Sequence, residues 1–345
     1  MGVQISPIIP KQAINLQDLS GKRIAIDAFN IIFQFLSIIR QKDTGEPLRD
    51  SKGRVTSHLS GLFYRNLNFL EAGIKPIYVF DGEPPRMKKT TIEFREAKRE
   101  EALKKWEEAL REGRKEDIMV YAQASSRITD EMIKESKELL RALGIPIVQA
   151  PSEGEAQASY MCIKGDVFAS SSQDMDSLLF GCPRLVRNLS ITGRRKMPRK
   201  EKWIEINPEL IELETVLREL GITREQLILV GMLVGTDYNP EGIPGFGPKK
   251  ALDFVKEKRT LSEVLKSIEW ISENDAEEIF NFFMNPKVTD DYEIKFGEID
   301  VEKVKKILVD EHEFSEERVN SNLQKFVEAK RKGMQYNLSS WFKNE

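Results

Sequence analysis

Short apolar runs that end at acidic residues recur along the first half of the chain. Runs of this length, bounded by Pro and Gly, are typical of buried strands. Helical patterns lie between them, at residues 30–39, 57–72 and 129–143. A strand, a helix and a second strand usually place the two strands side by side and parallel, so the sequence predicts an α/β fold. The acids that follow the runs are Asp27, Asp81, Glu153, Glu155, Asp174 and Asp176.

Four of these acids lie in one stretch, residues 145–181, where two apolar runs each end in an acidic pair. Ligands of open α/β sheets bind beyond the carboxyl ends of the strands, so four carboxylates are expected at one edge. Four negative charges at close spacing repel one another unless a cation lies between them. Sites made only of oxygen ligands suit Mg²⁺ or Mn²⁺, and the sequence therefore predicts a metal site there.

The composition changes directly after Asp81. Residues 86–115 contain eleven Lys or Arg and seven Asp or Glu, and their apolar positions give a helix only a narrow stripe. A solvated surface helix explains such a segment most simply. Its place next to Asp81 favours instead an insertion that arches over the acids. Lys88 and Arg95 are seven residues apart, so a helix would carry both on one face.

The second half of the chain has helical patterns at residues 208–220 and 223–234, and short helices are expected to about residue 332. Thr223 opens the second of these with the spacing of a capping box. A basic stretch at residues 192–200 holds five Lys or Arg. It is expected either as a solvated hairpin tip or as a contact for phosphates.

A glycine-rich turn follows, with the sequence Gly245-Phe-Gly-Pro-Lys-Lys. Gly245 and Gly247 permit a tight turn that exposes backbone N–H groups, and Pro248 suits the first turn of the next helix. The N-terminus of a helix binds phosphate, and Lys249 and Lys250 add positive charge. Two helices joined in this way can hold a DNA backbone without reading its sequence.

The C-terminal stretch combines a Leu and two aromatic residues with otherwise polar surroundings, at Leu338, Trp341 and Phe342. One explanation is a tail that folds back on the protein. The alternative is a peptide that becomes ordered in a partner's pocket, anchored by these apolar side chains.

Four longer motifs stand out along the chain. They are Val79-Phe-Asp-Gly-Glu-Pro-Pro, Ala150-Pro-Ser-Glu-Gly-Glu-Ala, Ser172-Gln-Asp-Met-Asp, and Gly235-Thr-Asp-Tyr with Gly245-Phe-Gly-Pro-Lys. Together they make the chain resemble the flap endonucleases, which are structure-specific 5′ nucleases of replication and repair. The resemblance covers essentially the whole sequence.

The resemblance implies a mostly parallel mixed sheet flanked by helices, with a helical arch and a helix–two-turn–helix motif. The nuclease domain would span residues 1–330, with the arch at 84–128 and the helix–two-turn–helix motif at 223–258. Residues 331–345 would form a flexible tail that resembles the family's binding peptide for the sliding clamp (PCNA). The tail positions that match this peptide are Gln335, Leu338, Trp341 and Phe342. Trp341 stands where the peptide has its first Phe.

The resemblance also implies roles for single residues. It implies two Mg²⁺ ions, for which Mn²⁺ can substitute, and a K⁺ ion at the helix–two-turn–helix motif. The acids that would hold the Mg²⁺ ions, directly or through water, are Asp27, Asp81, Glu153, Glu155, Asp174, Asp176 and Asp237. Lys88 and Arg95 match the arch bases that offset charge on the transferring phosphate. The positions that match DNA contacts are Gly2, Phe33, Arg65, Gly245, Gly247, Lys249 and Lys250.

Composition is compatible with this picture. The chain has 345 residues, 40% of them hydrophobic, and a net charge of −3; with seven acids reserved for metal, the rest carries +4. With only Cys162 and Cys182, a disulfide framework is not expected and a reducing, cytoplasmic setting is. No apolar run approaches the ~20 residues of a membrane span.

We therefore expect a monomeric, Mg²⁺-dependent 5′ flap endonuclease and 5′–3′ exonuclease, archaeal in type. It would cut DNA at junctions of single strand and duplex, in lagging-strand replication and base excision repair, with stimulation by the clamp. One alternative is a clamp-tethered protein that binds DNA junctions without cutting, which would not need the acids. Another is a phosphatase, suggested by Asp174 and Asp176, but Asp27-Ala-Phe lacks the nucleophile pattern of that class.

Overall fold

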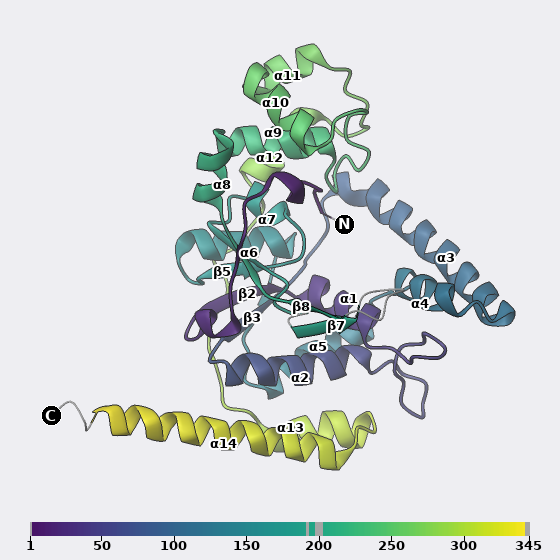
Figure 1. The fold of residues 1–345 in the computed structure, drawn as a ribbon, viewed down its shortest axis with the longest axis vertical. Helices are drawn as coiled ribbons and strands as arrows, with labels where there is room; N and C mark the ends of the chain where they lie inside the picture. Colours follow the sequence, from purple (N-terminus) through teal and green to yellow (C-terminus); the bar gives the residue numbers. More distant parts are fainter. Residues whose placement is uncertain (1, 191–192, 197–202, 342–345) are drawn as a thin grey trace.

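The computed structural model describes residues 2–190, 193–196 and 203–341 of the chain (Figure 1). A seven-stranded sheet lies at its centre, in the order β1-β9-β6-β5-β2-β3-β4. Strands β6, β5, β2, β3 and β4 run parallel, whereas β9 is antiparallel to β6 and β1. The predicted mixed, mostly parallel sheet is thus confirmed. The strands are β1 (Gln12–Ala13), β2 (Arg23–Asp27), β3 (Lys75–Phe80), β4 (Ile147–Gln149), β5 (Ala169–Ser171), β6 (Arg184–Arg187) and β9 (Glu209–Glu212).

Both faces of the central strands are apolar, because alternate side chains point to opposite sides of the sheet. In β3, Tyr78 and Phe80 pack into one core, whereas Ile77 and Val79 pack into another. The first core lies under α1 (Ala28–Ile38), α2 (Ser57–Glu71) and α5 (Asp130–Ala142). The second lies under α6 (Gly154–Lys164). Helices on both faces are what a parallel sheet requires.

A third core belongs to a group of helices beyond the carboxyl ends of the strands, at the top of Figure 1. The group consists of α7 (Asp176–Leu179), α8 (Leu213–Leu220), α9 (Arg224–Val234), α10 (Pro248–Lys258), α11 (Leu261–Ser267) and α12 (Ala276–Met284). The predicted local signals are present: Thr223 forms a capping box at α9, and Pro248 is the first residue of α10. The N-terminal segment, with the 3₁₀ turn Ser6–Ile8, packs against this core through Val3 and Ile5.

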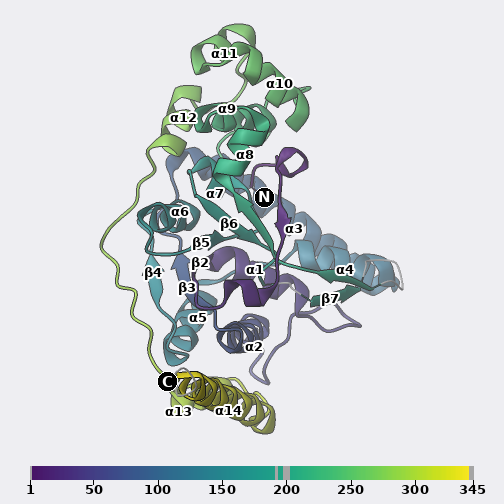
Figure 2. The ribbon, with the colours of Figure 1, turned by 60° about the vertical axis from the view of Figure 1, so that its left-hand side comes forward.

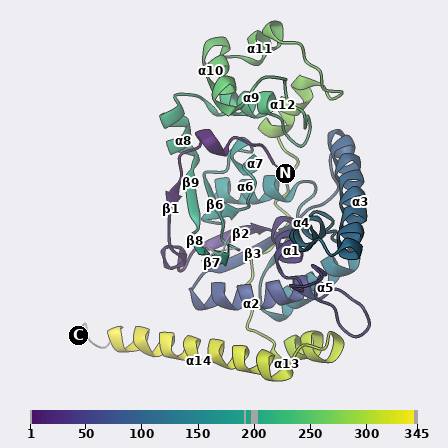
Figure 3. The same ribbon diagram turned by 45° about the vertical axis from the view of Figure 1, so that its right-hand side comes forward.

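The charged insertion forms two helices, α3 (Lys89–Glu112) and α4 (Lys115–Ala124), joined at Gly113. Helix α3 stands at the side of the molecule, as Figure 3 shows. Its Trp106 indole donates a hydrogen bond to the carbonyl of Thr44, which ties the helix to the loop after α1.

One predicted helix was wrong in its first turn. Residues 208–220 were expected as a single helix, but Glu209–Glu212 is strand β9 and the helix α8 begins at Leu213. Strand β9 pairs with β6 on one side and with the two-residue β1 on the other. These partners are distant in sequence, and pairing with them outweighs the local helical pattern.

The C-terminal region also differs from the expected short helices. After α12 the chain runs extended along the side of the molecule to α13 (Val301–Lys305), as Figure 2 shows. Tyr292, Ile294 and Phe296 of this extended segment pack against the core under α6. A π-helical turn (Lys306–Glu311) leads into the long helix α14 (Glu316–Trp341). The backbone of the expected flexible tail is therefore helical to Trp341, and Phe342 lies outside the described residues.

A shared carboxylate attaches this region to the body. The Glu135 carboxylate of α5 contacts the Nε2 atom of His58 at 3.0 Å and that of His312 at 3.4 Å. Both histidines are buried, so the contact joins α2, α5 and the C-terminal segment in one polar cluster.

Gly144 lets the extended segment approach the end of α5, and its replacement tests this contact. Its φ is +70°, and an added Cβ would lie 2.4 Å from the Gly297 carbonyl oxygen. Gly221 has a similar φ of +65° with nothing within 4 Å of such a Cβ. Gly221→Ala should cost about 1–2 kcal/mol of unfolding free energy through backbone strain alone. Gly144→Ala should cost about 1–3 kcal/mol more, because the backbone of Gly297 must move.

Urea unfolding of the two variants measures this difference. Equal losses in Gly144→Ala and Gly221→Ala would show that the contact between Gly144 and Gly297 is not tightly packed.

Candidate active site

The seven predicted acids come from the carboxyl ends of neighbouring strands and from one turn above them. Asp27 ends β2 and caps α1, where it accepts a hydrogen bond from the Asn30 backbone N–H. Asp81 follows β3 and accepts a hydrogen bond from the Gly154 N–H at the start of α6, at 2.6 Å. The remaining acids are Glu153 and Glu155 at the start of α6, Asp174 between β5 and α7, Asp176 at the start of α7, and Asp237 in the turn after α9.

These acids form one electrostatic group. Burial raises the pKa of Asp27 well above its usual range, and the charges of Asp81 and Asp174 raise it further. Burial and the charge of Asp176 do the same to the pKa of Glu155. Such shifts arise when carboxylates share a site and have little water between them.

Asp176 and Glu153 belong to the same electrostatic group. Burial, then the charges of Asp237 and Asp174, raise the pKa of Asp176 to about 7. Burial also raises the pKa of Glu153, although the Lys88 ammonium lowers it in part. A strongly perturbed pKa in a group of convergent carboxylates indicates a functional site.

Two basic residues of the insertion reach this group. The Lys88 Nζ atom lies 2.6 Å from the Glu153 carboxylate and 3.5 Å from that of Asp237. Arg95 forms an ion pair with Asp237. Burial favours the neutral form of Lys88, but the charges of Glu153, Asp237 and Asp81 outweigh it and raise its pKa. Both bases are therefore cations held among the acids.

The carboxylate oxygens of these acids are suitable ligands for a divalent metal ion. The Oε1 atom of Glu155 is buried and accepts no hydrogen bond from the part of the chain that the structure describes. A buried carboxylate oxygen without a donor is costly, and a hard cation or its bound water would satisfy it. In the present arrangement, no three acidic, His or Cys side chains among the described residues are grouped so as to hold one ion. Instead, Lys88 and Arg95 pair with Glu153 and Asp237.

The N-terminal segment supplies further contacts to the acids. The backbone N–H of Gly2 donates to Asp174 Oδ1 and that of Val3 to Asp176 Oδ1, both at 2.9 Å. A Cβ at Gly2 would lie 2.5 Å from both acids, so only glycine fits this approach without movement. Asn30 also donates from its side chain to Asp174, at 3.2 Å. Sequence patterns could not indicate Val3 or Asn30, because backbone amides and single Asn residues carry no such signal.

The predicted DNA contacts lie in three places. Phe33 and Arg65 are half-buried on α1 and α2, and burial lowers the pKa of Arg65. Gly245 and Gly247 are exposed in the turn from α9 to α10, and Lys249 and Lys250 are exposed in the first turn of α10. Gly245 has a φ of +83°, as the predicted tight turn requires. Lys250 lies over the Phe246 ring at 4.9 Å from its centre.

Of the basic stretch at residues 192–200, the structure describes residues 193–196. Strand β7 (Gly193–Lys196) lies within this stretch and pairs antiparallel with β8 (Trp203–Ile206), whereas the expected hairpin tip falls on residues 197–202, outside the described residues. Its contact with phosphates stays a prediction.

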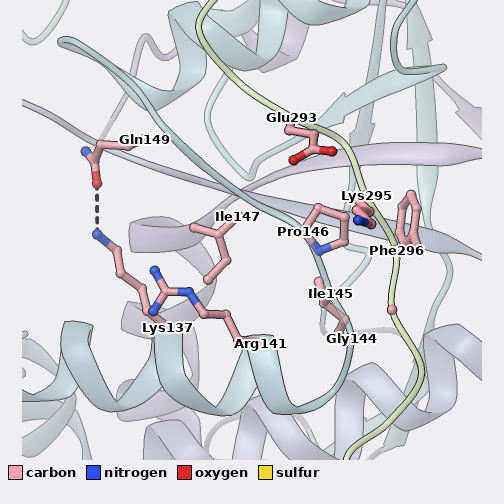
Figure 4. A pocket seen from close by; sticks show the side chains of 11 residues that line it. Lys137, Arg141, Gly144, Ile145, Pro146, Ile147, Gln149, Glu293, Lys295 and Phe296 are labelled. Atoms are coloured by element: carbon pink, nitrogen blue, oxygen red, sulfur yellow. Dashed lines mark hydrogen bonds between the residues drawn. The ribbon is translucent and has the colours of Figure 1, made fainter.

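A cavity of about 500 Å³ lies away from the acids, between α5, β4 and the extended segment (Figure 4). Lys137, Arg141 and Lys295 bring positive charge to it, and Lys137 donates a hydrogen bond to Gln149 at 2.8 Å. None of the seven acids lines this cavity, so we place the active site at the seven acids and not at the cavity.

Comparison with known proteins decides the family. Family models described as the XPG N-terminal domain and the XPG I-region match residues 1–102 and 144–237. The chain is 58% identical over 342 residues to Flap endonuclease 1 of Pyrococcus abyssi, covering 99% of this chain and 98% of the relative. Its identity to Flap endonuclease 1 of Pyrococcus furiosus is 57% over 343 residues, covering 99% and 100%. The chain belongs to the flap endonuclease family.

Solved structures of this family share the fold. Flap endonuclease-1 from Methanococcus jannaschii superposes with a TM-score of 0.75 at 44% identity, covering 95% of this chain and 98% of that one. The catalytic core of Rad2, solved in complex with a DNA substrate, gives a TM-score of 0.69 at 25% identity, covering 93% and 97%. The chain is therefore a nuclease of the flap endonuclease family, and all seven acids lie within the two matched regions.

No helix among the described residues combines the length and the apolarity that crossing a bilayer requires.

The raised pKa of Asp176 predicts a stability change in protein freed of metal by a chelator. Between the unfolded value of 3.8 and the folded value of about 7, the folded state keeps a proton that the unfolded state releases. Folding stability therefore falls as the pH rises through this window. Asp176→Asn removes the charge and keeps the acceptor for the Val3 N–H. It should stabilise the protein at pH 8 by on the order of 2 kcal/mol.

Calorimetric unfolding at pH 8 and at pH 5 checks this. The gain should be smaller at pH 5, where Asp176 of the folded wild type is already protonated. A variant that is less stable than the wild type at pH 8 would contradict the electrostatic account.

Proposed function

We propose that this nuclease is a Mg²⁺-dependent, structure-specific 5′ flap endonuclease and 5′–3′ exonuclease. It would hydrolyse DNA at junctions of single strand and duplex and leave a 5′ phosphate and a 3′ hydroxyl. Its setting would be lagging-strand replication and base excision repair. The observation that carries the proposal is the group of seven convergent carboxylates, with two bases of the insertion held among them, in a chain with full-length relatives named Flap endonuclease 1.

We assign the metal-holding role to the seven acids, directly or through water. Two bound Mg²⁺ ions, or Mn²⁺ in their place, would activate a water and offset charge on the leaving oxygen. The buried, donor-free Glu155 oxygen supports this assignment, as does the raised pKa of its neighbours. The backbone amides of Gly2 and Val3 fix the orientation of Asp174 and Asp176 for that task.

Lys88 and Arg95 would act on the transferring phosphate. Charge builds on that group during the reaction, and cations already held at the site stabilise it without further reorganisation. Both now pair with carboxylates, so divalent ions that neutralise those carboxylates would free the two bases for the substrate. Lys88 is mostly buried, which strengthens its electrostatic effect.

The remaining DNA contacts would position the substrate. The exposed turn between α9 and α10, with Lys249 and Lys250, would hold the duplex backbone near the N-terminus of α10. We assign a K⁺ ion to this helix–two-turn–helix motif, where backbone carbonyl oxygens would hold it. Phe33 would stack on a base, and Arg65 would contact the backbone.

A protein that binds junctions without cutting them is the second candidate, and the acids weigh against it. Burying several carboxylates that raise one another's pKa destabilises the fold. A protein that only binds has no use for such a group.

Cleavage of an end-labelled double-flap DNA tests the proposal. The wild type should cut at the junction in Mg²⁺ and not in excess chelator. Asp174→Asn keeps the size of the side chain and removes a charge, so it should lower the single-turnover rate by more than about 100-fold. Its affinity for the DNA, measured in Ca²⁺, should change little, because the turn between α9 and α10 is untouched.

Rapid cutting by Asp174→Asn would overturn the site assignment. Tight binding by the wild type without any product in Mg²⁺ or Mn²⁺ would favour the junction-binding candidate.

We further propose that the tail binds a sliding clamp through Gln335, Leu338, Trp341 and Phe342. Large apolar side chains near a chain end are typical anchors for a partner's pocket. Replacing both Trp341 and Phe342 with Ala should abolish stimulation of cleavage by an archaeal clamp and leave unstimulated cleavage unchanged. The control is the Lys343→Ala variant, which leaves the apolar anchors in place. Clamp stimulation that survives the double replacement would refute this role.

A further inference from the structure

Two segments far apart in the sequence meet where the insertion joins the body. One is the root of the insertion, the 3₁₀ turn Arg86–Lys88 and the first turn of α3. The other is the turn that carries Asp237, held by reciprocal backbone hydrogen bonds between Thr236 and Asn239. The buried Thr91 hydroxyl donates to the Asp237 carbonyl at 2.6 Å and links the two.

A second link comes from a third segment, the loop before α12. The side-chain nitrogen of Asn274 donates to the Met87 carbonyl at 2.8 Å and to the Tyr238 carbonyl at 2.6 Å. Both partners are carbonyl oxygens and can only accept, so the amide nitrogen must face them. One amide group thus uses both of its protons to join the root of the insertion to the residue after Asp237.

Asn274 is itself held in place. Its backbone N–H donates to the Ser272 hydroxyl at 3.3 Å, and its carbonyl accepts from the Trp270 indole at 2.8 Å. The next residue, Asp275, caps α12. The loop therefore presents the amide from a fixed backbone.

Helix α12 also packs against the turn that carries Asp237. The rings of Phe282 and Phe283 lie edge-on to the buried Tyr238 ring, with centres 4.8 and 5.4 Å away. Met87 is buried in the same core. The side chains of Met87 and Tyr238 are thus held by the core, and Asn274 holds their backbones at a fixed spacing.

We propose that Asn274 is a positioning residue for cleavage, which keeps Lys88 beside the acids by joining the root of the insertion to the Asp237 turn. This inference rests on the proposed function. Asn274 lies beyond both regions that the family models match, the second of which ends at residue 237. It contacts neither Lys88 nor Asp237 directly and acts on both through the adjacent residues Met87 and Tyr238.

A small displacement of the root would suffice to affect the reaction. Lys88 follows Met87 directly, so release of the Met87 carbonyl frees the backbone that carries Lys88. A misplacement of about 1 Å can cost about 100-fold in rate. Asn274→Ala should therefore lower the single-turnover rate on double-flap DNA by about 10- to 100-fold. Affinity for the same DNA in Ca²⁺ should stay within about twofold, since the turn between α9 and α10 is unchanged.

Two companion variants separate hydrogen bonding from shape and from general damage. Asn274→Asp keeps the size of the side chain and loses both donors, so it should be at least as slow as Asn274→Ala. Asn281→Ala removes an exposed Asn of α12 and should cleave like the wild type. If Asn274→Asp cleaves at the wild-type rate, the donated hydrogen bonds are not needed and the inference fails.

A double-variant cycle tests whether the effect passes through Lys88. In a Lys88→Ala background, Asn274→Ala should slow cleavage by less than about threefold, since the base that it positions is gone. If Asn274→Ala slows cleavage as much in that background as in the wild type, the positioning role is refuted. The two substitutions would then act independently, as expected when Asn274→Ala causes general structural damage.

Amide hydrogen exchange gives a readout that needs no cleavage. In protein without metal, Asn274→Ala should speed exchange at residues 86–95 and 236–240, while Asn281→Ala should not. Unchanged exchange there would overturn the inference, even if cleavage were slow. If the wild type does not cut flap DNA in Mg²⁺, the proposed function is refuted. The exchange measurement would then still show whether Asn274 joins the two segments.

Discussion

Mutual repulsion among buried carboxylates is the constraint on which the rest of the structure depends. Burial and neighbouring charge oppose ionisation of Asp27, Glu155 and Asp176, so these side chains would avoid one another in a relaxed chain. The fold holds them together because each is fixed to a different rigid element: Asp27 to the end of β2, Glu155 to the first turn of α6 and Asp176 to the start of α7. The cost is offset by donated hydrogen bonds from Gly2, Val3 and Gly154, and by Lys88 and Arg95.

The grouping of six of the seven acids at one edge of the sheet could be predicted from the sequence alone, because the signal is local. An apolar run that stops at Asp27 or Asp81 marks both a buried strand and the end at which ligands bind. Asp237 carries no such mark, since it follows a helix, and only resemblance to a family pointed to it. The spacing of Lys88 and Arg95 suggests a common role for these two bases of the insertion, but their pairing with Glu153 and Asp237 depends on contacts across the fold.

The failures have a common cause in long-range contacts. Strand β9 exists because β6 and the short β1 pair with it, and the sequence of residues 209–212 alone fits a helix equally well. Asn274 is one polar residue in a polar loop, and its two acceptors lie 187 and 36 residues away.

The extended segment before α13 lies along one edge of the sheet. An open edge strand is a template for pairing with a neighbouring molecule, which leads to aggregation. Strand β4 forms one edge with only three residues, and β1 forms the other with two. The segment lies beside β4 and fixes itself there through a hydrogen bond from the Gly297 N–H to the Gly144 carbonyl, at 2.9 Å. The segment also places the exposed charges of Glu293 and Lys295 beside this edge, and such charges disfavour pairing with a second sheet.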